Sequence, residues 1–359
     1  MIKFLHAADF HLDAPFSSLG REAAVLRRQE QRDAVRRLVE VCNENQCDLL
    51  LLAGDLLDSD GAWQETIRCL TESFAACSAQ IFIAPGNHDR FVPGCPYDTV
   101  QWPDNVHIFT KNRLEAVTLP ELGCAVYGAA FNAMDSEPLL TGFAVEDPDM
   151  TNLMVIHGEV KADSAYNAMT EAQIAASGLD YLALGHIHQF SGRQQAGKTV
   201  YAWPGCLMGH GFDELGEKGY ILGEIGRDGC SIRFEAMPGR RYQILHVQAG
   251  DDAAAAIEAA LPALTEQDIY RIYLEGEAEP VDERALYRRF QSRFFGLTIR
   301  DRTTPKADLW AACGEDTLRG LFLRELRERY DRAEDEDTRH SIALAARYGL
   351  AAMEGREGL

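Results

Sequence analysis

Residues 2–11, IKFLHAADFH, open the chain with an apolar run that ends on an acid and an imidazole. The run has the length and apolar character of a buried strand. Asp9 and His11 follow where that strand is expected to end. Side chains at positions i and i+2 of an extended segment point to the same side, so this pair is expected to face one point in space.

Four further apolar runs end in the same way, on side chains that can bind a metal ion. They are CDLLLLAGD at 47–55, QIFIAPGNHD at 80–89, NLMVIHG at 152–158 and DYLALGHIH at 180–188. Ligands bind beyond the carboxyl ends of strands in α/β sheets, so the five runs are expected to bring their last residues together. The candidate ligands are Asp9, His11, Asp55, Asn87, His157, His186 and His188, with His88 beside Asn87.

Each of these histidines alone has a simpler explanation, because a buried histidine with a satisfied hydrogen bond is commoner than a ligand. However, five of the ten histidines fall at these strand ends, and their order along the chain argues for one site. The same turns contain Gly54, Gly86, Gly158 and Gly185, which permit sharp bends of the backbone. Asp13, close behind His11, is expected either to border the ligands or to cap the following turn.

The candidate donors are carboxylates, an amide oxygen and imidazoles, without a thiolate. This set suits Mn²⁺, Fe²⁺ or Zn²⁺ rather than a structural cysteine–zinc site. Seven ligands are too many for one ion and fit two ions that share a carboxylate. Two ions about 3.5–4 Å apart can activate a bridging water and hold a phosphate for in-line displacement.

Composition indicates an ordinary globular chain of 359 residues with 46% apolar and 25% charged residues, enough for one large domain or two to three modest ones. The net charge of -21 argues against a broadly basic nucleic-acid surface and against binding to an anionic membrane. It leaves room for phosphate binding through metal ions. Nine dispersed cysteines without a C-x-x-C motif, and an N-terminus without a signal-peptide pattern, favour the reducing cytoplasm.

The pattern along the chain divides it into three parts, at 1–238, 242–303 and 306–359. Strand-like and helix-like stretches alternate in the first part, and a β-α-β-α-β run follows in the second. The third part is wholly helical. In the helix expected at 21–45, the predicted buried face consists of Val25, Leu26, Val35, Leu38, Val39 and Cys42. Its solvated face is expected to carry Arg27, Arg28, Arg32, Arg36 and Arg37.

The ordered motifs DFH, GDLLD, GNHD, HG and GHIH, spread over residues 9–188, resemble the signature of the calcineurin-like metallophosphoesterases. The resemblance implies an α/β (α+β) fold, an αββα four-layer sandwich of two mixed sheets, followed here by a small α/β capping domain and terminal helices. It also implies one ion on Asp9, His11, Asp55 and His188, and a second on Asp55, Asn87, His157 and His186. Asp55 would bridge the ions, and Mn²⁺ is the expected metal, with Fe²⁺ or Zn²⁺ as alternatives.

The same resemblance implies that a metal-bridging hydroxide attacks phosphorus. His88 would stabilise or protonate the leaving oxygen, and Asp89 would orient His88. Asp58 has no place among the ligands and is expected to support one of them from behind.

Within the family, ADFHLDAPF at 8–16, AGDLLDSD at 53–60 and PGNHDR at 85–90 resemble bacterial DNA repair nucleases of the SbcD and YhaO type. WPGCLMGHGFDELGEKG at 203–219 is most similar to the YhaO-like group, with Cys206 where most SbcD-type chains have serine. The branch implies a DNA exonuclease or endonuclease that forms a homodimer. The last helices would either dock on an SbcC-like ATPase or pack on their own chain. Cys206 is assigned no role, and His210 is expected to border the site or to shape its loop.

Two other functions fit the same motifs. A phosphodiesterase for small nucleotides or nucleotide conjugates could use the same two ions, and the net charge of -21 favours it. A noncatalytic scaffold stabilised by metal is the second alternative. His88 argues against the scaffold, since a pure scaffold does not need this imidazole.

Overall fold

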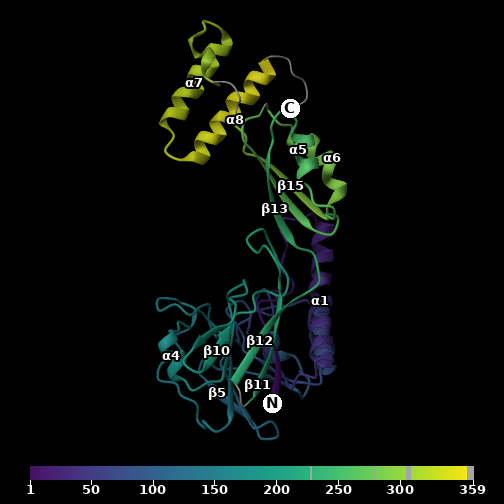
Figure 1. Cartoon of the computed structure of the whole chain (residues 1–359), viewed down its shortest axis with the longest axis vertical. Helices are drawn as coiled ribbons and strands as arrows, with labels where there is room; N and C mark the ends of the chain where they lie inside the picture. Colours follow the sequence, from purple (N-terminus) through teal and green to yellow (C-terminus); the bar gives the residue numbers. More distant parts are fainter. Residues whose placement is uncertain (227–228, 279, 305–308, 354–359) are drawn as a thin grey trace. The chain divides into compact units, whose positions relative to one another are not determined.

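The computed structural model describes residues 1–226, 229–278, 280–304 and 309–353. The chain forms two compact units, Met1–Gly239 and Arg240–Leu359 (Figure 1). The first unit carries every candidate ligand, and the second follows the break expected near residues 237–241.

Two mixed six-stranded sheets build the first unit, so the fold class expected from the sequence is confirmed. In each sheet four neighbouring strands run parallel; antiparallel pairing completes one edge of the first sheet and both edges of the second. The first sheet has the order β12 (Gly229–Ala236), β11 (Gly219–Gly226), β1 (Ile2–Ala7), β2 (Leu49–Leu52), β3 (Gln80–Ile83) and β4 (Val106–Ile108). The second has the order β5 (Glu115–Leu119), β6 (Cys124–Gly128), β7 (Thr151–His157), β8 (Tyr181–Gly185), β10 (Thr199–Ala202) and β9 (Gln194–Ala196).

Alternation along the strands divides the core into layers. In β2, Leu49 and Leu51 join a buried cluster with residues of the second sheet, such as Val155. Leu50 and Leu52 point the other way, into a cluster with α1 (Arg21–Glu44) and α2 (Gln64–Ala75). A third cluster covers the outer face of the second sheet, beneath α4 (Glu171–Ala176). A further short helix, α3 (Pro96–Thr99), follows β3. Both faces of β2 and β8 are buried, and their sequences are accordingly continuous apolar runs.

The buried face of α1 differs from the prediction in its first half. Val25 and Leu26 are 51% and 52% exposed, whereas Arg27 is 0% and Arg32 is 6% exposed. Two nitrogens of the Arg27 guanidinium have acceptors inside the protein, because Nη2 donates to the Gly209 carbonyl at 2.9 Å and Nη1 to a Glu30 carboxylate oxygen at 2.6 Å. The expectation of a wholly solvated arginine face was therefore wrong.

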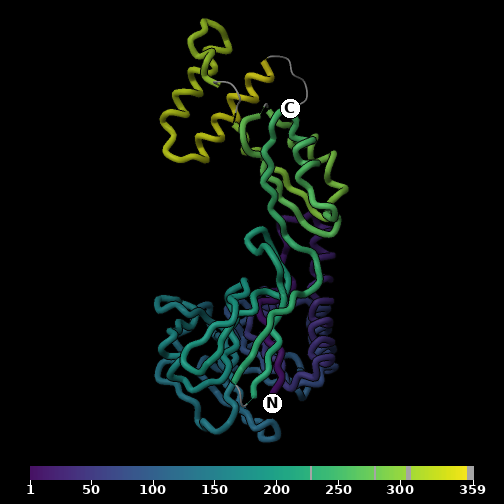
Figure 2. Tube along the Cα trace, in the orientation of Figure 1, coloured from purple at the N-terminus to yellow at the C-terminus, as the bar shows by residue number. Residues whose placement is uncertain are grey.

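The second unit contains a parallel three-stranded sheet of β13 (Tyr242–Gln248), β14 (Ile269–Glu275) and β15 (Gly296–Asp301). Two helices, α5 (Ala253–Ala260) and α6 (Glu283–Phe290), connect these strands in the predicted alternation. Short 3-10 turns follow at η1 (Gln291–Arg293) and η2 (Ala311–Gly314). The last helices, α7 (Leu318–Arg332) and α8 (Glu336–Met353), lie side by side around Leu323 and Ala346 (Figure 2).

The predicted C-terminal part at 306–359 includes residues 306–308 and 354–359, which lie outside the described residues. The boundary between that part and the small α/β domain therefore stays a prediction. Among the described helices, none combines the length and the apolar character that a membrane span requires.

Candidate metal centre

The candidate ligands follow the carboxyl ends of five strands of the first unit, β1, β2, β3, β7 and β8. These strands belong to the parallel parts of the two sheets, whose carboxyl ends lie at one edge. Donor atoms from Asp9, His11 and His188 lie within 4.8 Å of one another, and so do donors from Asp9, Asp55 and His157. Residues separated by more than a hundred positions therefore meet at one place.

The Asp55 carboxylate lies between the two groups of donors. Its Oδ2 is 3.3 Å from Nε2 of His157 and 3.8 Å from Nε2 of His11. The Asn87 side-chain oxygen lies 3.0 Å from Nε2 of His157. On the other side, Nε2 of His11 and Nε2 of His188 are 3.1 Å apart. The structure thus brings the predicted donors into two adjoining clusters with Asp55 in the middle.

His186 is placed differently from the other candidates. Its backbone N–H donates to Asp9 Oδ1 at 3.0 Å. Its ring centroid lies 5.2 Å from that of His157 and 4.5 Å from that of Tyr166. The ring therefore borders the cluster that contains His157 and packs against an aromatic side chain.

The backbone at four candidate ligands is left-handed rather than extended. The φ angles are 54° at Asp9, 43° at His11, 51° at Asp55 and 103° at His186. The expectation that Asp9 and His11 meet because they are i and i+2 of an extended segment was therefore wrong. Tertiary hydrogen bonds hold the turn instead, with Asp9 N–H donating to the Gly54 carbonyl and His11 N–H to the Asp55 carbonyl, both at 3.0 Å. Such conformations cost about 1–3 kcal/mol each and concentrate at functional sites.

A close approach of backbone to side chain explains the glycine at position 86. A Cβ atom there would lie 2.2 Å from Oδ1 of Asp55 and 2.8 Å from the Asp55 backbone nitrogen. Only glycine leaves the Asp55 carboxylate its present position.

Burial and charge shift the titration of the cluster. Burial opposes ionisation of Asp55, but the adjacent positive His157 outweighs burial and holds the pKa of the Asp55 carboxyl well below its usual range. Burial likewise opposes charge on His157, yet Asp55 raises the pKa of His157 to about 9. Burial, aided by the charge of His157, lowers the pKa of His186 to about 4. Burial raises the pKa of the Asp9 carboxyl. In the metal-free protein a proton on His157 therefore compensates the buried Asp55 charge.

His88 lies beside the cluster. Its backbone N–H donates to Oδ1 of Asp55 at 2.9 Å, and its ring nitrogen Nδ1 lies 3.3 Å from the Asp58 carbonyl oxygen. The ring meets the His11 ring edge-on, with centroids 4.7 Å apart. The Asp58 side chain contacts Nδ1 of His11 at 3.2 Å, on the side of that ring opposite the cluster.

Asp89 is fully buried but serves a different group from the one expected. Its carboxylate accepts hydrogen bonds from the backbone amides of residues 55, 56, 57 and 86, and from the Tyr97 hydroxyl. The expected contact was with the His88 ring, whose described polar partner is instead the Asp58 carbonyl. Asp89 thereby joins the turn after β2 to the turn after β3, and acts on His88 only through the backbone.

The structure adds side chains that the sequence did not single out. Glu214 contacts Nδ1 of His188, and Gln31 on α1 donates to the carbonyls of Phe10 and His11 at 3.1 and 2.8 Å. The segment at 203–219 stood out in the sequence, but its acids Asp213, Glu214 and Glu217 could not be told apart there. Asp13, expected near the ligands or at a turn, accepts from Trp63 N–H and the Thr66 hydroxyl, at the start of α2.

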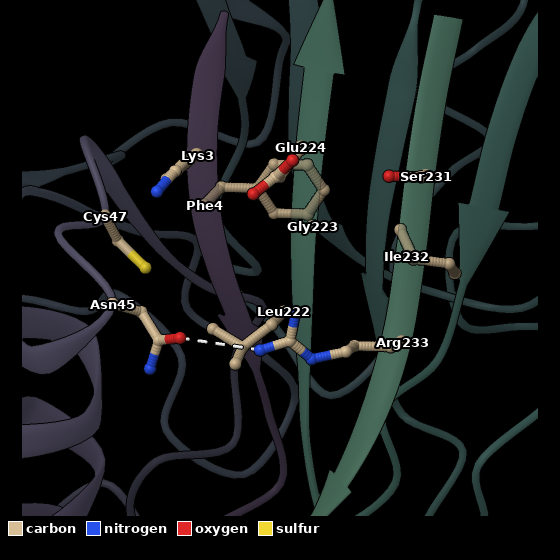
Figure 3. A pocket seen from close by; sticks show the side chains of 10 residues that line it. All are labelled: Lys3, Phe4, Asn45, Cys47, Leu222, Gly223, Glu224, Ser231, Ile232 and Arg233. Carbon is tan, nitrogen blue, oxygen red and sulfur yellow. Dashed lines mark hydrogen bonds between the residues drawn. The ribbon is translucent and has the colours of Figure 1, made fainter.

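The donor set fits a pair of divalent ions on chemical grounds. Asp9 and Asp55 are 0% and 1% exposed, and buried carboxylates require compensating positive charge. Carboxylate, amide and imidazole donors suit Mn²⁺, Fe²⁺ or Zn²⁺. A hollow beside the first half of β1, lined by Lys3, Cys47, Glu224 and Arg233 among others, shares no residue with this cluster (Figure 3).

Comparison with known proteins places this site in a family. Residues 2–190 match the family model of the calcineurin-like phosphoesterases. The chain is 29% identical over 272 residues to the uncharacterized metallophosphoesterase YhaO of Bacillus subtilis. The aligned region covers 71% of this chain and 64% of that relative. It is 26% identical over 280 residues to the DNA double-strand break repair protein Mre11 of Aeropyrum pernix, and the aligned region covers 70% of this chain and 64% of that relative.

The chain thus matches less than two thirds of the length of either curated relative. Among solved structures, the protein TT1561 of Thermus thermophilus aligns with 13% identity and a TM-score of 0.40, over 65% of this chain and 98% of that one. The family model covers more than half of the chain and contains all seven candidate ligands, and the family uses a dimetal centre. The chain therefore belongs to the calcineurin-like phosphoesterases.

Proposed function

We propose that this protein is a dimetal-dependent phosphodiesterase that cleaves DNA, as a repair nuclease of the SbcD and YhaO type. The observation that carries the proposal is the convergence of donors from five strand ends around the Asp55 carboxylate. The similarity to a protein named for DNA double-strand break repair supports DNA as the substrate.

One ion would be held by Asp9, His11, Asp55 and His188, and the other by Asp55, Asn87, His157 and His186. Two such ions, most readily Mn²⁺, supply an activated water and offset the charge of the phosphate. The described geometry supports this division, because Oδ2 of Asp55 faces His157 on one side and His11 on the other.

The chain's own contribution to leaving-group departure falls to His88. Its Nδ1 can donate to the Asp58 carbonyl at 3.3 Å, which turns Nε2 away from that carbonyl. A protonated His88 can then give a proton from Nε2 to the leaving oxygen. Asp89 supports this placement indirectly, since it fixes the two backbone turns that carry Asp55 and His88.

Metal analysis and turnover of two variants test these roles. His88→Ala should retain both ions and lose about 10²–10⁴-fold in turnover, the contribution usual for a general acid. Asp55→Ala should lose both ions. If His88→Ala loses its metal, His88 is a ligand and the assignment fails.

Substrate class is tested on the same preparations. Linear DNA, cyclic dinucleotides and bis-p-nitrophenyl phosphate are offered with Mn²⁺, and DNA cleavage is expected. The alternative, a phosphodiesterase for small nucleotides, is favoured by the net charge of -21 and would cleave only the small substrates. A metal-loaded protein that cleaves none of the three, with or without an ATPase partner, would act as a scaffold.

We further propose that the helical part at 306–359 docks on an SbcC-like coiled-coil ATPase. Leu318 and Leu321 on α7 are 72% and 56% exposed, which supports a partner-binding role for that helix. Co-purification of the full chain with such an ATPase, compared with a Leu318→Glu, Leu321→Glu variant, tests this assignment. Equal recovery of both proteins would contradict it.

A further inference from the structure

The segment between β10 and β11 contributes one buried acid to the metal centre, Glu214, which is 8% exposed. Both of its carboxylate oxygens are engaged. Oε1 contacts Nδ1 of His188, while Oε2 lies 2.6 Å from the His210 backbone nitrogen and 2.9 Å from Nδ1 of the His210 ring. The Cys206 thiol lies 3.5 Å from the same oxygen. A single side chain thus ties His188 to its neighbouring loop.

The contact with Glu214 determines which nitrogen His188 presents to the centre. A carboxylate can only accept, so Nδ1 of His188 must carry a proton to bond it. In the neutral ring this leaves Nε2 with its lone pair, and Nε2 is the atom that lies 3.1 Å from Nε2 of His11. Two such lone pairs facing each other repel unless a cation or a proton lies beside them.

The other member of that pair has the same arrangement. Nδ1 of His11 contacts the Asp58 carboxylate at 3.2 Å, so each of the two imidazoles has an acid behind it. A hydrogen bond of this kind orients a ligand ring and strengthens its basicity. The neighbourhood of His188 is further fixed by Lys218, whose Nζ donates to the His188 carbonyl at 2.9 Å.

We propose that Glu214 is a positioning residue for the metal centre: it holds His188 in the tautomer whose Nε2 is free to bind an ion. This inference rests on the proposed function, because it assigns His188 as a ligand. Glu214 would act only through His188, as no described contact joins its carboxylate to the other candidate ligands.

Replacement by glutamine discriminates this role from simple packing. Glutamine has nearly the same shape, but one of the two oxygens becomes an NH₂ group. With the oxygen toward His188, the NH₂ would face the N–H of His210, and with the amide turned, the NH₂ would face Nδ1 of His188. The first orientation leaves buried donors opposed, and the second favours the tautomer that blocks Nε2.

Metal binding tests the proposal without reliance on activity. Mn²⁺ stoichiometry and affinity are measured by equilibrium dialysis for the wild type, Glu214→Gln and Asp213→Asn. Asp213 is the exposed neighbouring acid, so its variant matches the change in charge. We expect two ions in the wild type and in Asp213→Asn. In Glu214→Gln one ion should bind about 10–100-fold more weakly while the other is retained.

Nitrogen-15 NMR of histidine in the metal-free wild type gives a readout that does not depend on the folding of any variant. Neutral His188 should carry its proton on Nδ1. A proton on Nε2, or unchanged affinity of both ions in Glu214→Gln, would overturn the inference. A wild type that binds fewer than two ions would instead contradict the proposed function, so the two failures are distinguishable.

Discussion

Replacing Gly86 by alanine would place a methyl group where the Asp55 carboxylate now lies. The added Cβ would be 2.2 Å from Oδ1 of Asp55, whereas real Cβ atoms essentially never come nearer than 3.0 Å. Relief requires a displacement of about 0.8 Å, the difference between these distances. The added Cβ would also lie 2.8 Å from the Asp55 backbone nitrogen, so a small shift of the alanine along Asp55 does not relieve the clash.

Asp55 cannot move by this amount without loss of its partners. Its Oδ1 accepts the His88 backbone N–H at 2.9 Å, and its own N–H donates to Asp89 at 3.1 Å. Overpacking of a rigid core costs about 1–3 kcal/mol, which we expect as the loss in unfolding free energy of the metal-free variant. Functional groups need placement within about 0.5 Å, so a shift of ~0.8 Å should weaken metal binding severely. Because Asp55 is the proposed shared ligand, both ions should be affected, each by at least about tenfold.

Three measurements follow the variant. Equilibrium dialysis gives the number and affinity of Mn²⁺ ions, urea unfolding in EDTA gives the stability, and bis-p-nitrophenyl phosphate hydrolysis gives turnover. Gly61→Ala is the matched control, since a Cβ at Gly61 meets no atom within 4 Å. A Gly86→Ala protein that binds two ions with wild-type affinity and unfolds at the same urea concentration would refute the reasoning.

Three further perturbations test the packing, the titration and the metal dependence. Arg27→Ala should lower the unfolding free energy by about 2–4 kcal/mol in urea titrations, because it removes a fully buried, hydrogen-bonded side chain. The control Arg36→Ala, on the exposed side of the same helix, should change it by less than about 0.5 kcal/mol. In the metal-free protein, His157 has a pKa of about 9 against 6.5 when unfolded, so its protonation should stabilise the fold by ~3 kcal/mol. This contribution should be complete below pH 6.5 and disappear as the pH rises through 9, and urea unfolding at several pH values should show no such dependence for His157→Gln. Removal of Mn²⁺ by EDTA, from a free concentration one hundred times Kd, should reduce stability by about 2.7 kcal/mol per ion, seen as a lower Tm.

The strands and the candidate ligands could be predicted because both signals are local in the sequence. A buried parallel strand requires a continuous apolar run, and Leu49–Leu52 has one. The candidate ligands then follow the carboxyl end of each run, so the order of motifs indicates which residues come together. No contact between distant residues needs to be known for this inference.

The first half of α1 was predicted wrongly because its environment comes from distant segments. Helical periodicity identifies a stripe of residues but not the groups opposite it. Arg27 can be buried because it donates to the Gly209 carbonyl, and Gln31 because it donates to the carbonyls of Phe10 and His11. These acceptors belong to the loops after β1 and β10, which the helix sequence alone does not reveal.

The local backbone of the site could not be predicted for a related reason. Asp and His are enriched among the non-glycine residues with φ > 0, but the conformation is still uncommon for them, so residue type alone does not predict it at a given position. At Asp9 and His11 the left-handed conformation is held by hydrogen bonds to the turn after β2, and these form only once the two strands pair. Glu214 was missed likewise, because its partner His188 is 26 residues away and the segment offered three acids.

The electrostatics of the site have a consequence for the order of binding. Asp9, Asp55 and Asp89 are all buried near one another, in a chain whose net charge is -21. Without cations, the proton on His157 is offset by the Asp55 charge, so it leaves no net positive charge at the centre to attract a phosphodiester. Two divalent ions would add four positive charges at that point and reverse the local field. We therefore expect DNA to bind only after the metals, so fluorescence anisotropy should detect DNA binding with Ca²⁺ or Mn²⁺ and none in EDTA. Equal affinity in both conditions would mean that the DNA is held by another surface of the protein, and the centre would then contribute chemistry without contributing to substrate capture.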